Sequence, residues 1–490
     1  MPNASEIASR RVSFEMHERF AALSGDRNPM HMDPLAARRT QAGAPVVHGI
    51  HTLLWALECL VQSGIIVSPV VRIRLKFPKW LYVGDHATVV LPGGEHSDPG
   101  TIHVKAAGMC ILAADVSYGA WSTMAPPPRL SPTPLAPRTT ALDLPPERLV
   151  GCEGVGYTSA PEDASALFPR LAAQLSGATV AEIAACSYIV GMELPGLHSM
   201  FSRLDLQISG IVDAAMPAGL PYRLAAYDER FGKARIEVAG RGVRGILEVF
   251  LRNPPVEQAS MRSLSEWVRP GEFSRIHALI IGGSRGLGEL TAKLIAAGGG
   301  TPTISYAVGR ADAERIADEI RGCGGAVDVL QYDVRQKPAP QLAGLKPTVT
   351  HLFYFATNSI FRPKEDLVSH PTLIDFVTYY LQGFHDLCLQ LLDARGSHRP
   401  QGAKLKAYYP SSVAVEERPA GMTEYSMIKA AGEQMCRDIN QFLPGIHVLT
   451  TRLPRLRTDQ TASVIPAHEL EPVTVLLPII RQMNEPLVYA

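Results

Sequence analysis

Residues Leu279–Leu287 read LIIGGSRGL, and this stretch decides how the last part of the chain folds. Its apolar residues predict a buried strand, which runs into a turn containing Gly282, Gly286 and Gly288. A helix is expected to begin near Glu289. Glycines at such a turn let the backbone approach a phosphate, and the helix N-terminus attracts its negative charge. The stretch therefore predicts a site for the pyrophosphate of a dinucleotide.

A second motif lies downstream, where Tyr425-Ser-Met-Ile-Lys429 follows Ser412 by thirteen residues. A tyrosine has an ordinary pKa of about 10, so it needs a nearby positive charge to exchange protons at neutral pH. Lys429 lies one helical turn from Tyr425 and can supply that charge while holding the nicotinamide ribose. Ser412 can hydrogen-bond a carbonyl oxygen and favour the developing alkoxide. The three side chains predict the reduction of a carbonyl group.

Together with the glycine turn, this motif resembles the short-chain dehydrogenase/reductase family over Arg275 to about Ser463. The resemblance is carried by GGSRGLG, Tyr332-Asp333-Val334, Phe355-Ala-Thr-Asn358, Ser412, Tyr425 and Lys429. It implies a doubly wound, Rossmann-like parallel sheet and catalytic roles for Ser412, Tyr425 and Lys429. It also implies cofactor contacts at Gly282, Ser284, Arg285, Gly286, Leu287, Gly288, Arg310, Asp333, Val334, Ala356, Thr357 and Thr458.

The cofactor expected at this site is NADPH. The second strand, near residues 301–308, ends without the acidic residue that would bind an adenosine ribose diol. Arg285 lies in the glycine turn and Arg310 follows the strand, and two guanidinium groups suit a 2′-phosphate. The alternative is that either arginine is exposed to solvent and neutral to the choice between NADPH and NADH.

Three positions depart from the family pattern. Tyr380 stands where family members usually place an asparagine before Leu-x-Gly, so the usual proton relay to solvent is expected to differ. Phe355-Ala-Thr-Asn358 keeps only part of the Asn-Asn-Ala-Gly element, and Leu453-Pro-Arg-Leu-Arg-Thr458 replaces a Pro-Gly turn. These changes are expected to affect rate or substrate range more than cofactor binding.

The first third of the chain contains another candidate site, in SGDRNPMHMDP at Ser24–Pro34. An apolar helix is predicted over Val46–Leu60, and strands are predicted over residues 71–77, 86–91, 102–110 and 114–119. Through SGDxNPxHxDP and the following VVHG, this segment resembles the MaoC-like, (R)-specific enoyl hydratase/dehydratase family. The resemblance implies a hot-dog fold, in which an antiparallel sheet wraps a long helix, and an acid/base pair at Asp26 and His31.

Asp26 and His31 suit the removal of water from a 3-hydroxyacyl thioester. That reaction needs a base for the C2 proton and an acid for the departing hydroxyl, and a carboxylate beside an imidazole can orient one water for both roles. Asn28 can hold this geometry, and the amide at the helix start, at Gly49, can polarise the thioester carbonyl. The alternative is that Asp26 and Asn28 only cap a turn.

The middle third, residues 151–256, is interpreted as a second, degenerate hot-dog. Leu171–Gly177 echoes Phe20–Gly25, and Leu194–Leu204 echoes the helical segment Val47–Leu57. Between the echoes, Ala178-Thr-Val-Ala-Glu-Ile replaces Asp-x-Asn-Pro-x-His. We expect this copy to complete the sheet and cover the acyl tunnel without a site of its own. The alternative is a divergent site at Glu182 and His198.

Composition excludes several classes of function. The 490 residues carry 47 basic and 47 acidic side chains, so no overall charge favours nucleic acid or an anionic membrane surface. Seven cysteines without metal-type pairing, no apolar N-terminal signal and no run that could span a bilayer predict a soluble, cytoplasmic protein with no metal site. The expected domains are residues 1–124, a proline-rich linker at 125–150, 151–256, a linker at 257–274, and 275–490.

The predicted fold is thus an α+β double hot-dog followed by an α/β Rossmann-like doubly wound parallel sheet. Two catalytic modules on one chain suggest NADPH-dependent reduction of a 3-oxoacyl thioester of acyl carrier protein or coenzyme A, followed by dehydration, in fatty acid or polyketide-like synthesis. One alternative is the reverse route, (R)-specific hydration and oxidation. Others are a reductase with the hot-dogs as an acyl-binding scaffold, and a reductase of a non-acyl ketone. A homodimer is expected, because reductases of this family usually pair through helices.

Overall fold

The computed structural model describes residues 5–93, 100–124, 136–209, 219–345, 349–358, 360, 367–395, 404–459 and 470–486. The chain forms two compact units, one ending at Pro254 and the other beginning at Pro255. The two predicted hot-dogs therefore fall in the first unit, and the predicted Rossmann-like part falls in the second. Residues 125–135 of the predicted proline-rich linker lie outside the described residues.

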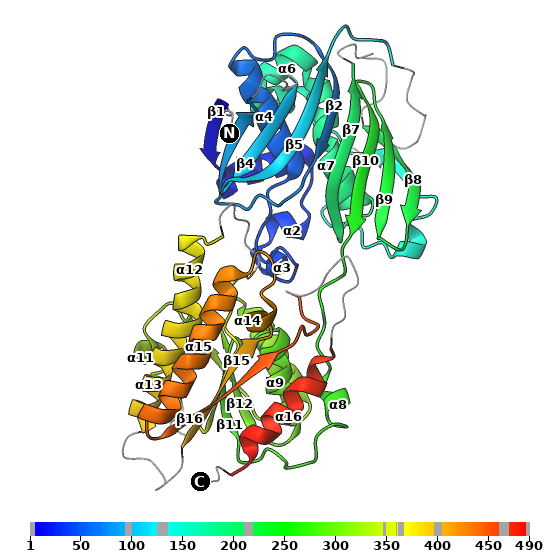
Figure 1. Ribbon diagram of the computed structural model, residues 1–490. Coiled ribbons are helices and arrows are strands. Elements are labelled where there is room, and N and C mark those ends of the chain that lie inside the picture. Colours follow the sequence, from blue (N-terminus) through cyan, green and yellow to red (C-terminus); the bar gives the residue numbers. More distant parts are fainter. Residues whose placement is uncertain are drawn as a thin grey trace. The chain divides into compact units, whose positions relative to one another are not determined.

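The first unit is built on one antiparallel sheet of ten strands, in the order β1-β3-β4-β5-β2-β7-β10-β9-β8-β6 (Figure 1). Read from its outer edge, each half of the sheet has the same strand order, and β2 pairs with β7 at the centre, with Ile73 opposite Leu206. This topology confirms the predicted internal repeat. The strands are β1 Ser5–Arg11, β2 Val70–Lys76, β3 His86–Leu91, β4 Thr101–Ala106, β5 Met109–Tyr118, β6 Glu153–Gly156, β7 Ser199–Ile208, β8 Leu220–Asp228, β9 Lys233–Ala239 and β10 Val243–Leu251.

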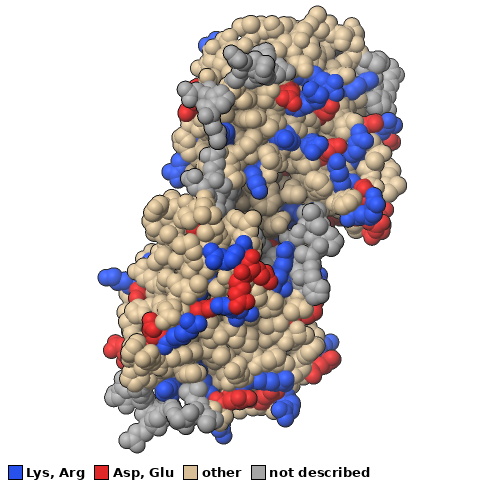
Figure 2. All heavy atoms as spheres, in the orientation of Figure 1, with Lys and Arg blue, Asp and Glu red and all other residues tan. Residues whose placement is uncertain are grey.

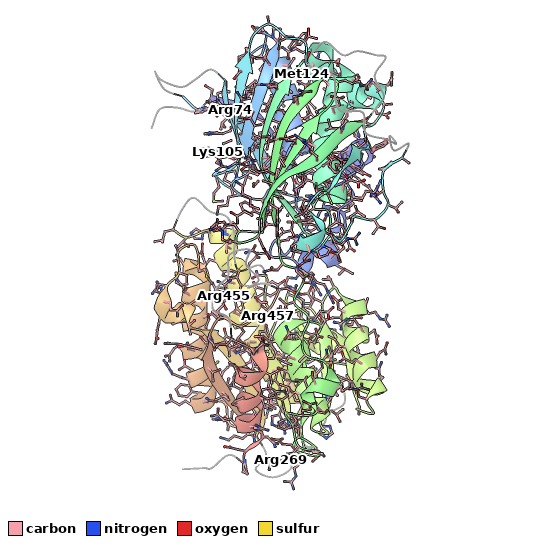
Figure 3. All side chains as sticks on the ribbon, turned by 90° about the vertical axis from the view of Figure 1, so that its right-hand side faces the viewer. Arg74, Lys105, Met124, Arg269, Arg455 and Arg457 are labelled. Atoms are coloured by element: carbon pink, nitrogen blue, oxygen red, sulfur yellow. The ribbon has the colours of Figure 1, made fainter. Side chains whose placement is uncertain are left out.

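Alternation along the strands gives this sheet one apolar and one charged face. In β2, Ile73 and Leu75 are buried, whereas Arg72, Arg74 and Lys76 are exposed, as a period of two requires. Figure 2 shows many Lys and Arg side chains, with fewer Asp and Glu, over the outer face of the sheet. Arg74 and Lys105 are labelled there in Figure 3.

The inner face of the sheet wraps two central helices, α4 Gly49–Gln62 and α7 Gly177–Tyr188, one for each copy (Figure 1). Nine residues of α4 are buried, and the two helices share one apolar core with both halves of the sheet. The remaining helices of this unit are α1 Phe14–Ser24, α2 Pro29–Met32, α3 Pro34–Arg38, the short 3-10 turn η1 Pro146–Arg148, α5 Pro161–Leu167, α6 Pro169–Leu175 and the π-helical turn η2 Ile189–Glu193.

The second copy differs from its prediction in the position of its central helix. The echo at Leu194–Leu204 predicts the counterpart of the helix of the first copy, but residues 199–204 lie in β7. In the first copy, residues 25–48 separate α1 from α4, whereas only Ser176 separates α6 from α7. Because that loop is missing, the helix comes earlier in the sequence than the echo suggests.

The apolar character of these helices raises the question of a membrane span. Within the described ranges, no single helix is long and apolar enough to cross a bilayer. The pair Pro169–Leu175 and Gly177–Glu193, bent by 110°, meets the criteria of length and composition only when taken together. Every residue of α7 from Thr179 to Tyr188 is buried in the core of the unit.

The second unit is a parallel sheet of six strands in the order β13-β12-β11-β14-β15-β16. This order is the doubly wound arrangement of dinucleotide-binding folds, so the predicted fold class is confirmed. The strands are β11 His277–Ile281, β12 Thr301–Tyr306, β13 Asp328–Gln331, β14 His351–Tyr354, β15 Leu405–Ser412 and β16 Ile446–Leu453.

Helices cover both faces of this parallel sheet. One apolar cluster joins it to α9 Gly286–Ala297, α10 Arg310–Gly322 and α16 Pro472–Asn484, and another joins it to α13 Gly383–Arg395 and α15 Thr423–Phe442 (Figure 1). The shorter elements are α8 Met261–Leu264, α11 Pro338–Gln341, α12 His370–Phe376, the π-helical turn η3 Val377–Gln382 and α14 Ala414–Glu417.

Candidate active sites

Asp26 follows Gly25, which caps the C-terminus of α1 with a left-handed φ of 78°. The Asp26 side chain is buried, and its Oδ1 accepts the backbone N–H of Asn28 at 3.1 Å. Asn28 in turn caps α2, since its Oδ1 accepts the N–H of Met30 at 3.0 Å. The turn-capping contacts of the alternative interpretation are thus present, but they hold a buried carboxylate rather than a surface one.

The second copy completes this site. Ser187 of α7 donates its hydroxyl to Asp26 Oδ2 at 2.7 Å, and the Asn28 amide donates to the carbonyl of Gly191 at 2.8 Å. A β-carbon at Gly191 would clash with the Asp26 carboxylate, so only glycine fits there. The degenerate copy therefore supplies a hydrogen bond, a backbone acceptor and the space that Asp26 needs.

His31 lies with Asp26 in one apolar pocket. Its Nδ1 donates to the carbonyl of Val46 at 2.6 Å, which leaves Nε2 as the basic nitrogen of the neutral ring. Gly49 is the first residue of α4 and lies against the ring of Phe77, where a β-carbon would not fit. The pocket is lined by residues of both copies, among them Asp26, His31, Gly49, Phe77, Trp80 and Phe201.

Burial controls the charges in this pocket. It raises the pKa of Asp26 above its ordinary range, against the opposing effects of His31 and the Ser187 hydrogen bond. It lowers the pKa of His17 to about 4 and holds the pKa of His48 well below its usual value. The lowered pKa values mean that His17 and His48 add no positive charge to the pocket at neutral pH.

Three imidazoles, those of His17, His31 and His48, offer nitrogen atoms within 4.8 Å of one another. The His17 and His48 rings stack, with centroids 4.5 Å apart and planes 29° apart, and the His31 and His48 centroids are 4.0 Å apart with planes 32° apart. The third pair is T-shaped, with the His17 and His31 planes 60° apart. One nitrogen of each ring lies within hydrogen-bond distance of a backbone carbonyl, His17 with His31, His31 with Val46 and His48 with Asp26, so these nitrogens have protein partners.

Glu182 and His198, the alternative site of the second copy, have structural partners. The Glu182 carboxylate accepts the backbone N–H groups of Arg241, Gly242 and Val243 at 2.8, 2.8 and 3.1 Å. It therefore closes the turn between β9 and β10. His198 Nε2 lies 3.6 Å from Asp143 Oδ1.

In the second unit, the glycine turn has the predicted geometry. Gly282 and Gly286 have left-handed φ angles of 75° and 56°, which favour glycine. A β-carbon at Gly288 would clash with the carbonyl of Gly282, so Gly288 allows the helix to pack against the turn. Helix α9 begins at Gly286, earlier than Glu289, and its N-terminus lies at the carboxyl end of β11.

The two arginines predicted to read the cofactor have different surroundings. Arg285 Nη1 lies 3.9 Å from the Asp459 carboxylate, and its side chain is 22 % exposed. Arg310 begins α10, where its side chain is 75 % exposed and lies 3.5 Å from Glu314.

The other predicted cofactor positions surround the carboxyl ends of the strands. Asp333 follows β13, and its carboxylate is paired with Arg335 at 2.6 Å. Thr458 lies next to Gly286, with its methyl group 4.0 Å from where a β-carbon would stand. Ser284 and Val334 are buried, Leu287 in the first turn of α9 packs on the apolar core, and Ala356 and Thr357 lie two and three residues after the end of β14.

Ser412, Tyr425 and Lys429 come together as predicted. Ser412 ends β15, Tyr425 and Lys429 lie one turn apart on α15, and Ser412 hydrogen-bonds Tyr425. The Lys429 ammonium donates to the carbonyl of Pro410 at 2.7 Å and lies 5.7 Å from the centre of the Tyr425 ring. A serine, a tyrosine and a lysine thus meet at the carboxyl edge of the parallel sheet, where this fold binds ligands.

Burial acts on both titratable groups of this set. It raises the pKa of Tyr425 to about 12, although the Ser412 hydrogen bond lowers it in part. It lowers the pKa of Lys429 to about 7. The positive charge expected to assist Tyr425 is therefore itself only partly retained at neutral pH.

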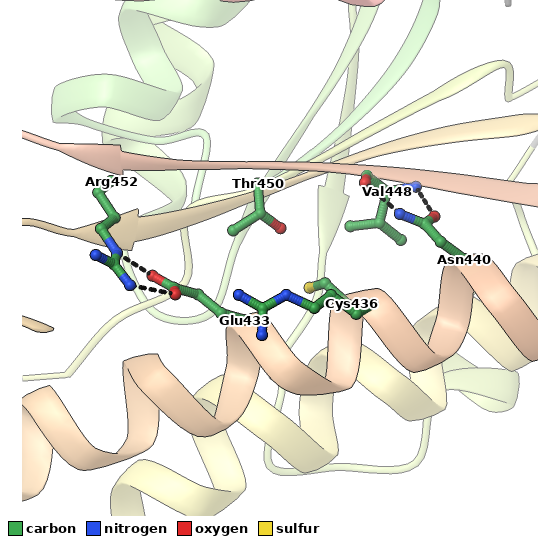
Figure 4. Close-up of a pocket in the computed structure, with 7 residues that line it drawn as sticks. Glu433, Cys436, Asn440, Val448, Thr450 and Arg452 are labelled. Carbon is green, nitrogen blue, oxygen red and sulfur yellow. Dashed lines mark hydrogen bonds and ion pairs between the residues drawn. The ribbon is translucent and has the colours of Figure 1, made fainter.

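A separate groove of about 370 Å³ lies between α15 and the edge strand β16 (Figure 4). Arg452 and Glu433 form an ion pair at 2.7 Å across it, and the Asn440 side chain bonds the backbone of Val448. None of the predicted site residues lines this groove. The Asn440 contacts occupy backbone groups of an edge strand, which limits its pairing with another strand.

Sequence reasoning misses the roles of two residues near the sites. Ser187 lies 161 residues from Asp26, and no local pattern marks it. Tyr380 stands out in the sequence only as a departure from the family asparagine, yet its ring lies 4.2 Å from the Lys429 ammonium. The only sequence signal for Ser187 is the internal repeat, and the shifted helix of the second copy hides it.

Fold and side chains together define a double hot-dog joined to a Rossmann-like domain with a serine, a tyrosine and a lysine grouped at the carboxyl edge of its sheet. Comparison with known families identifies the first part more closely: residues 4–109 match the model described as "MaoC like domain". The chain thus contains a MaoC-like domain, and the predicted resemblance is confirmed there.

Similar solved structures include 3-ketoacyl-(acyl-carrier-protein) reductase from Brucella melitensis complexed with NADH, with 20% identity, 42% of this chain and 91% of that chain covered, and a TM-score of 0.38. A short-chain dehydrogenase from Sphingobium yanoikuyae in complex with NADPH is 20% identical. The match covers 42% of this chain and 84% of that one, with a TM-score of 0.36. A bulky-bulky ketone specific alcohol dehydrogenase from Comamonas testosteroni is 19% identical. The match covers 42% of this chain and 83% of that one, with a TM-score of 0.36. No curated protein matches the chain.

Proposed function

We propose that this chain is a bifunctional enzyme that reduces a 3-oxoacyl thioester with NADPH and dehydrates the 3-hydroxyacyl product to the trans-2-enoyl thioester. One observation carries the proposal. Asp26 and His31 share a pocket of a MaoC-like domain on the same chain as a grouped Ser412, Tyr425 and Lys429. The product of the second set is the substrate of the first.

The glycine turn fits a dinucleotide, since Gly282, Gly286 and Gly288 bring backbone and helix N-terminus to one place. Arg285 and Arg310 would hold the 2′-phosphate of NADPH, which when bound supplies the hydride. Ser412 would orient the 3-oxo group, and the Tyr425 hydroxyl would give its proton to that oxygen. Lys429 would favour the tyrosinate that remains.

Dehydration would take place at Asp26 and His31. One of the two removes the proton at C2, and the other protonates the departing hydroxyl, directly or through one bound water. The backbone N–H at Gly49, at the N-terminus of α4, would polarise the thioester carbonyl. Ser187 and Asn28 would hold the carboxylate in place during the reaction.

The proposal includes the partners and the setting of the enzyme. The acyl group would be carried by acyl carrier protein or coenzyme A, in fatty acid or polyketide-like synthesis in the cytoplasm, and the enzyme would act as a homodimer. NADPH use supports the reductive direction, whereas a preference for NAD would support (R)-specific hydration followed by oxidation.

The test is incubation of the purified protein with NADPH and a short 3-oxoacyl thioester, with nicotinamide absorbance and product mass recorded. We expect oxidation of NADPH and an enoyl product. Asp26→Asn should stop at the 3-hydroxyacyl thioester, and Tyr425→Phe should leave NADPH unused while still dehydrating added 3-hydroxyacyl thioester. If the unmutated protein forms the 3-hydroxyacyl thioester but no enoyl product, the hot-dogs are a scaffold and not a dehydratase. If the 3-oxoacyl thioester is not reduced at all, the assignment of an acyl thioester substrate is wrong.

A further inference from the structure

The ring of Tyr380 lies against the lysine of the proposed reductase site. Tyr380 belongs to the π-helical turn η3 between α12 and α13, and it is 2 % exposed. The centre of its ring is 4.2 Å from the Lys429 ammonium. The family resemblance predicts an asparagine at position 380. In this chain the aromatic ring of Tyr380 stands there, against the Lys429 ammonium.

Lys429 lies among three tyrosine rings. Its ammonium is 4.2 Å from the centre of the Tyr380 ring, 5.0 Å from Tyr409 and 5.7 Å from Tyr425. Its hydrogen bond goes to the carbonyl of Pro410. The ring nearest to the ammonium is thus that of Tyr380, and a cation within about 6 Å of a ring face is attracted by the ring quadrupole.

This attraction matters because the ammonium is buried. With 4 % of Lys429 exposed, water contributes little to solvating its charge, and burial lowers its pKa to about 7. The titratable groups around it are Tyr425 and Cys436 on α15, Tyr409 on β15 and Tyr380 on η3, and no carboxylate in the described chain forms an ion pair with it. A ring face that attracts the charged form then raises the share of Lys429 present as the ammonium rather than the amine.

Tyr380 is itself held on two sides. Its hydroxyl forms a hydrogen bond with the hydroxyl of Thr357, which follows β14 at the predicted cofactor edge. Its ring packs on Phe376 and Tyr425, with centroids 5.6 and 5.7 Å apart. The ring therefore has little freedom to move away from Lys429.

We propose that Tyr380 is a positioning residue of the reductase, whose ring keeps the Lys429 ammonium charged and beside Tyr425 while its hydroxyl fixes Thr357 at the cofactor edge. The inference rests on the proposed reductase function. It assigns to an aromatic ring the task of holding the lysine, in place of an amide at this position.

The test compares Tyr380→Phe, which keeps the ring, with Tyr380→Leu, which removes it. Phe353→Leu is the matched control, because Phe353 is equally buried but its ring neighbours, His351 and Tyr408, are not among the rings around Lys429. The descending limb of the pH–rate profile reports loss of the Lys429 proton. We expect that limb to move about one pH unit lower in Tyr380→Leu, with about tenfold less kcat at pH 8, and to stay in place in Tyr380→Phe and Phe353→Leu.

A second readout needs no turnover. In protein labelled with ¹³C at the lysine Cε, the Lys429 signal, assigned by its loss in Lys429→Arg, should titrate at lower pH in Tyr380→Leu than in the unmutated chain. An identical Lys429 titration in both would overturn the inference. If no thioester is reduced but the Lys429 signal still moves, the proposed function fails while the role of Tyr380 stands.

Discussion

At Asp26, folding and chemistry make opposite demands on one carboxyl group. The group is buried and its pKa is raised, so the folded state binds its proton more tightly than the unfolded chain does. Ionisation of Asp26 therefore reduces the stability of the fold, beginning above the ordinary pKa of an aspartate and reaching its full extent above the raised folded pKa. Retention of an unfavourable charge in a pocket is typical of a functional group.

From this we expect Asp26→Asn to be more stable than the unmutated protein while it loses dehydration. At pH 8 its Tm for the first unit should rise by roughly 2–4 °C, and the difference should shrink as the pH falls toward the ordinary aspartate range. Thermal unfolding at several pH values measures this. Asp33→Asn, at an exposed helix cap, is the control and should show no such rise; a lower Tm for Asp26→Asn at pH 8 would contradict the argument.

Ser187 tests whether the second copy takes part in the chemistry. Ser187→Ala removes the hydroxyl that donates to Asp26 at 2.7 Å, and a hydrogen bond to a charged group contributes about 1.5–3 kcal/mol. We expect kcat for dehydration to fall about 10- to 100-fold, with reduction unchanged. Ser63→Ala, which removes an exposed helix-end hydroxyl, should leave both rates unchanged. Equal dehydration rates in Ser187→Ala and Ser63→Ala would mean that Ser187 takes no part in the reaction.

At the scale of elements, the glycine turn before α9 depends on close contact between helix and strand end. Gly288→Ala would push a methyl group against the carbonyl of Gly282, so we expect NADPH binding to weaken at least tenfold. Quenching or enhancement of NADPH fluorescence on titration measures this. Gly322→Ala, in α10 with open space around it, is the control and should bind NADPH normally and gain up to about 1 kcal/mol of stability.

Elements with a local signal are the ones that sequence can predict. The alternation in β2 and the predicted strand at residues 86–91 follow from period-two patterns, and the turn at Gly282 follows from glycine spacing. The predicted position of the second central helix is wrong, because a deletion in the loop before α7 changes the spacing and not the pattern. The contact between Ser187 and Asp26 escapes prediction since it arises only when the two copies share a sheet.

At the scale of the whole molecule, the first unit has one core that spans both copies. The apolar cluster includes residues of α4 and α7 and of both halves of the sheet, and β2 pairs with β7 across the middle. Neither copy can bury its apolar face without the other. The loop that carries Asp26 and Asn28 likewise exchanges hydrogen bonds with the second copy, since Asp26 accepts from Ser187 and Asn28 donates to Gly191.

We therefore expect residues 1–254 to fold and dehydrate 3-hydroxyacyl thioesters by themselves, and residues 1–124 to do neither. Circular dichroism, thermal unfolding and enoyl formation measure the two fragments. A 1–254 fragment that folds but does not dehydrate would mean that the second unit contributes to the dehydratase. A well-folded and active 1–124 fragment would contradict the shared core.

The single residue Ser176, which joins α6 to α7, has a consequence for the history and stoichiometry of the enzyme. A duplicated gene would first have encoded two equivalent chambers, each with a loop from one copy and a closing helix from the other. On this account, shortening one loop to a single residue would have removed one chamber, while α7 of that same copy still donates a hydrogen bond to Asp26 in the remaining one. A tight-binding analogue of the enoyl thioester should accordingly saturate at one molecule per chain, and natural variation in the second copy should be least tolerated at Ser187 and Gly191.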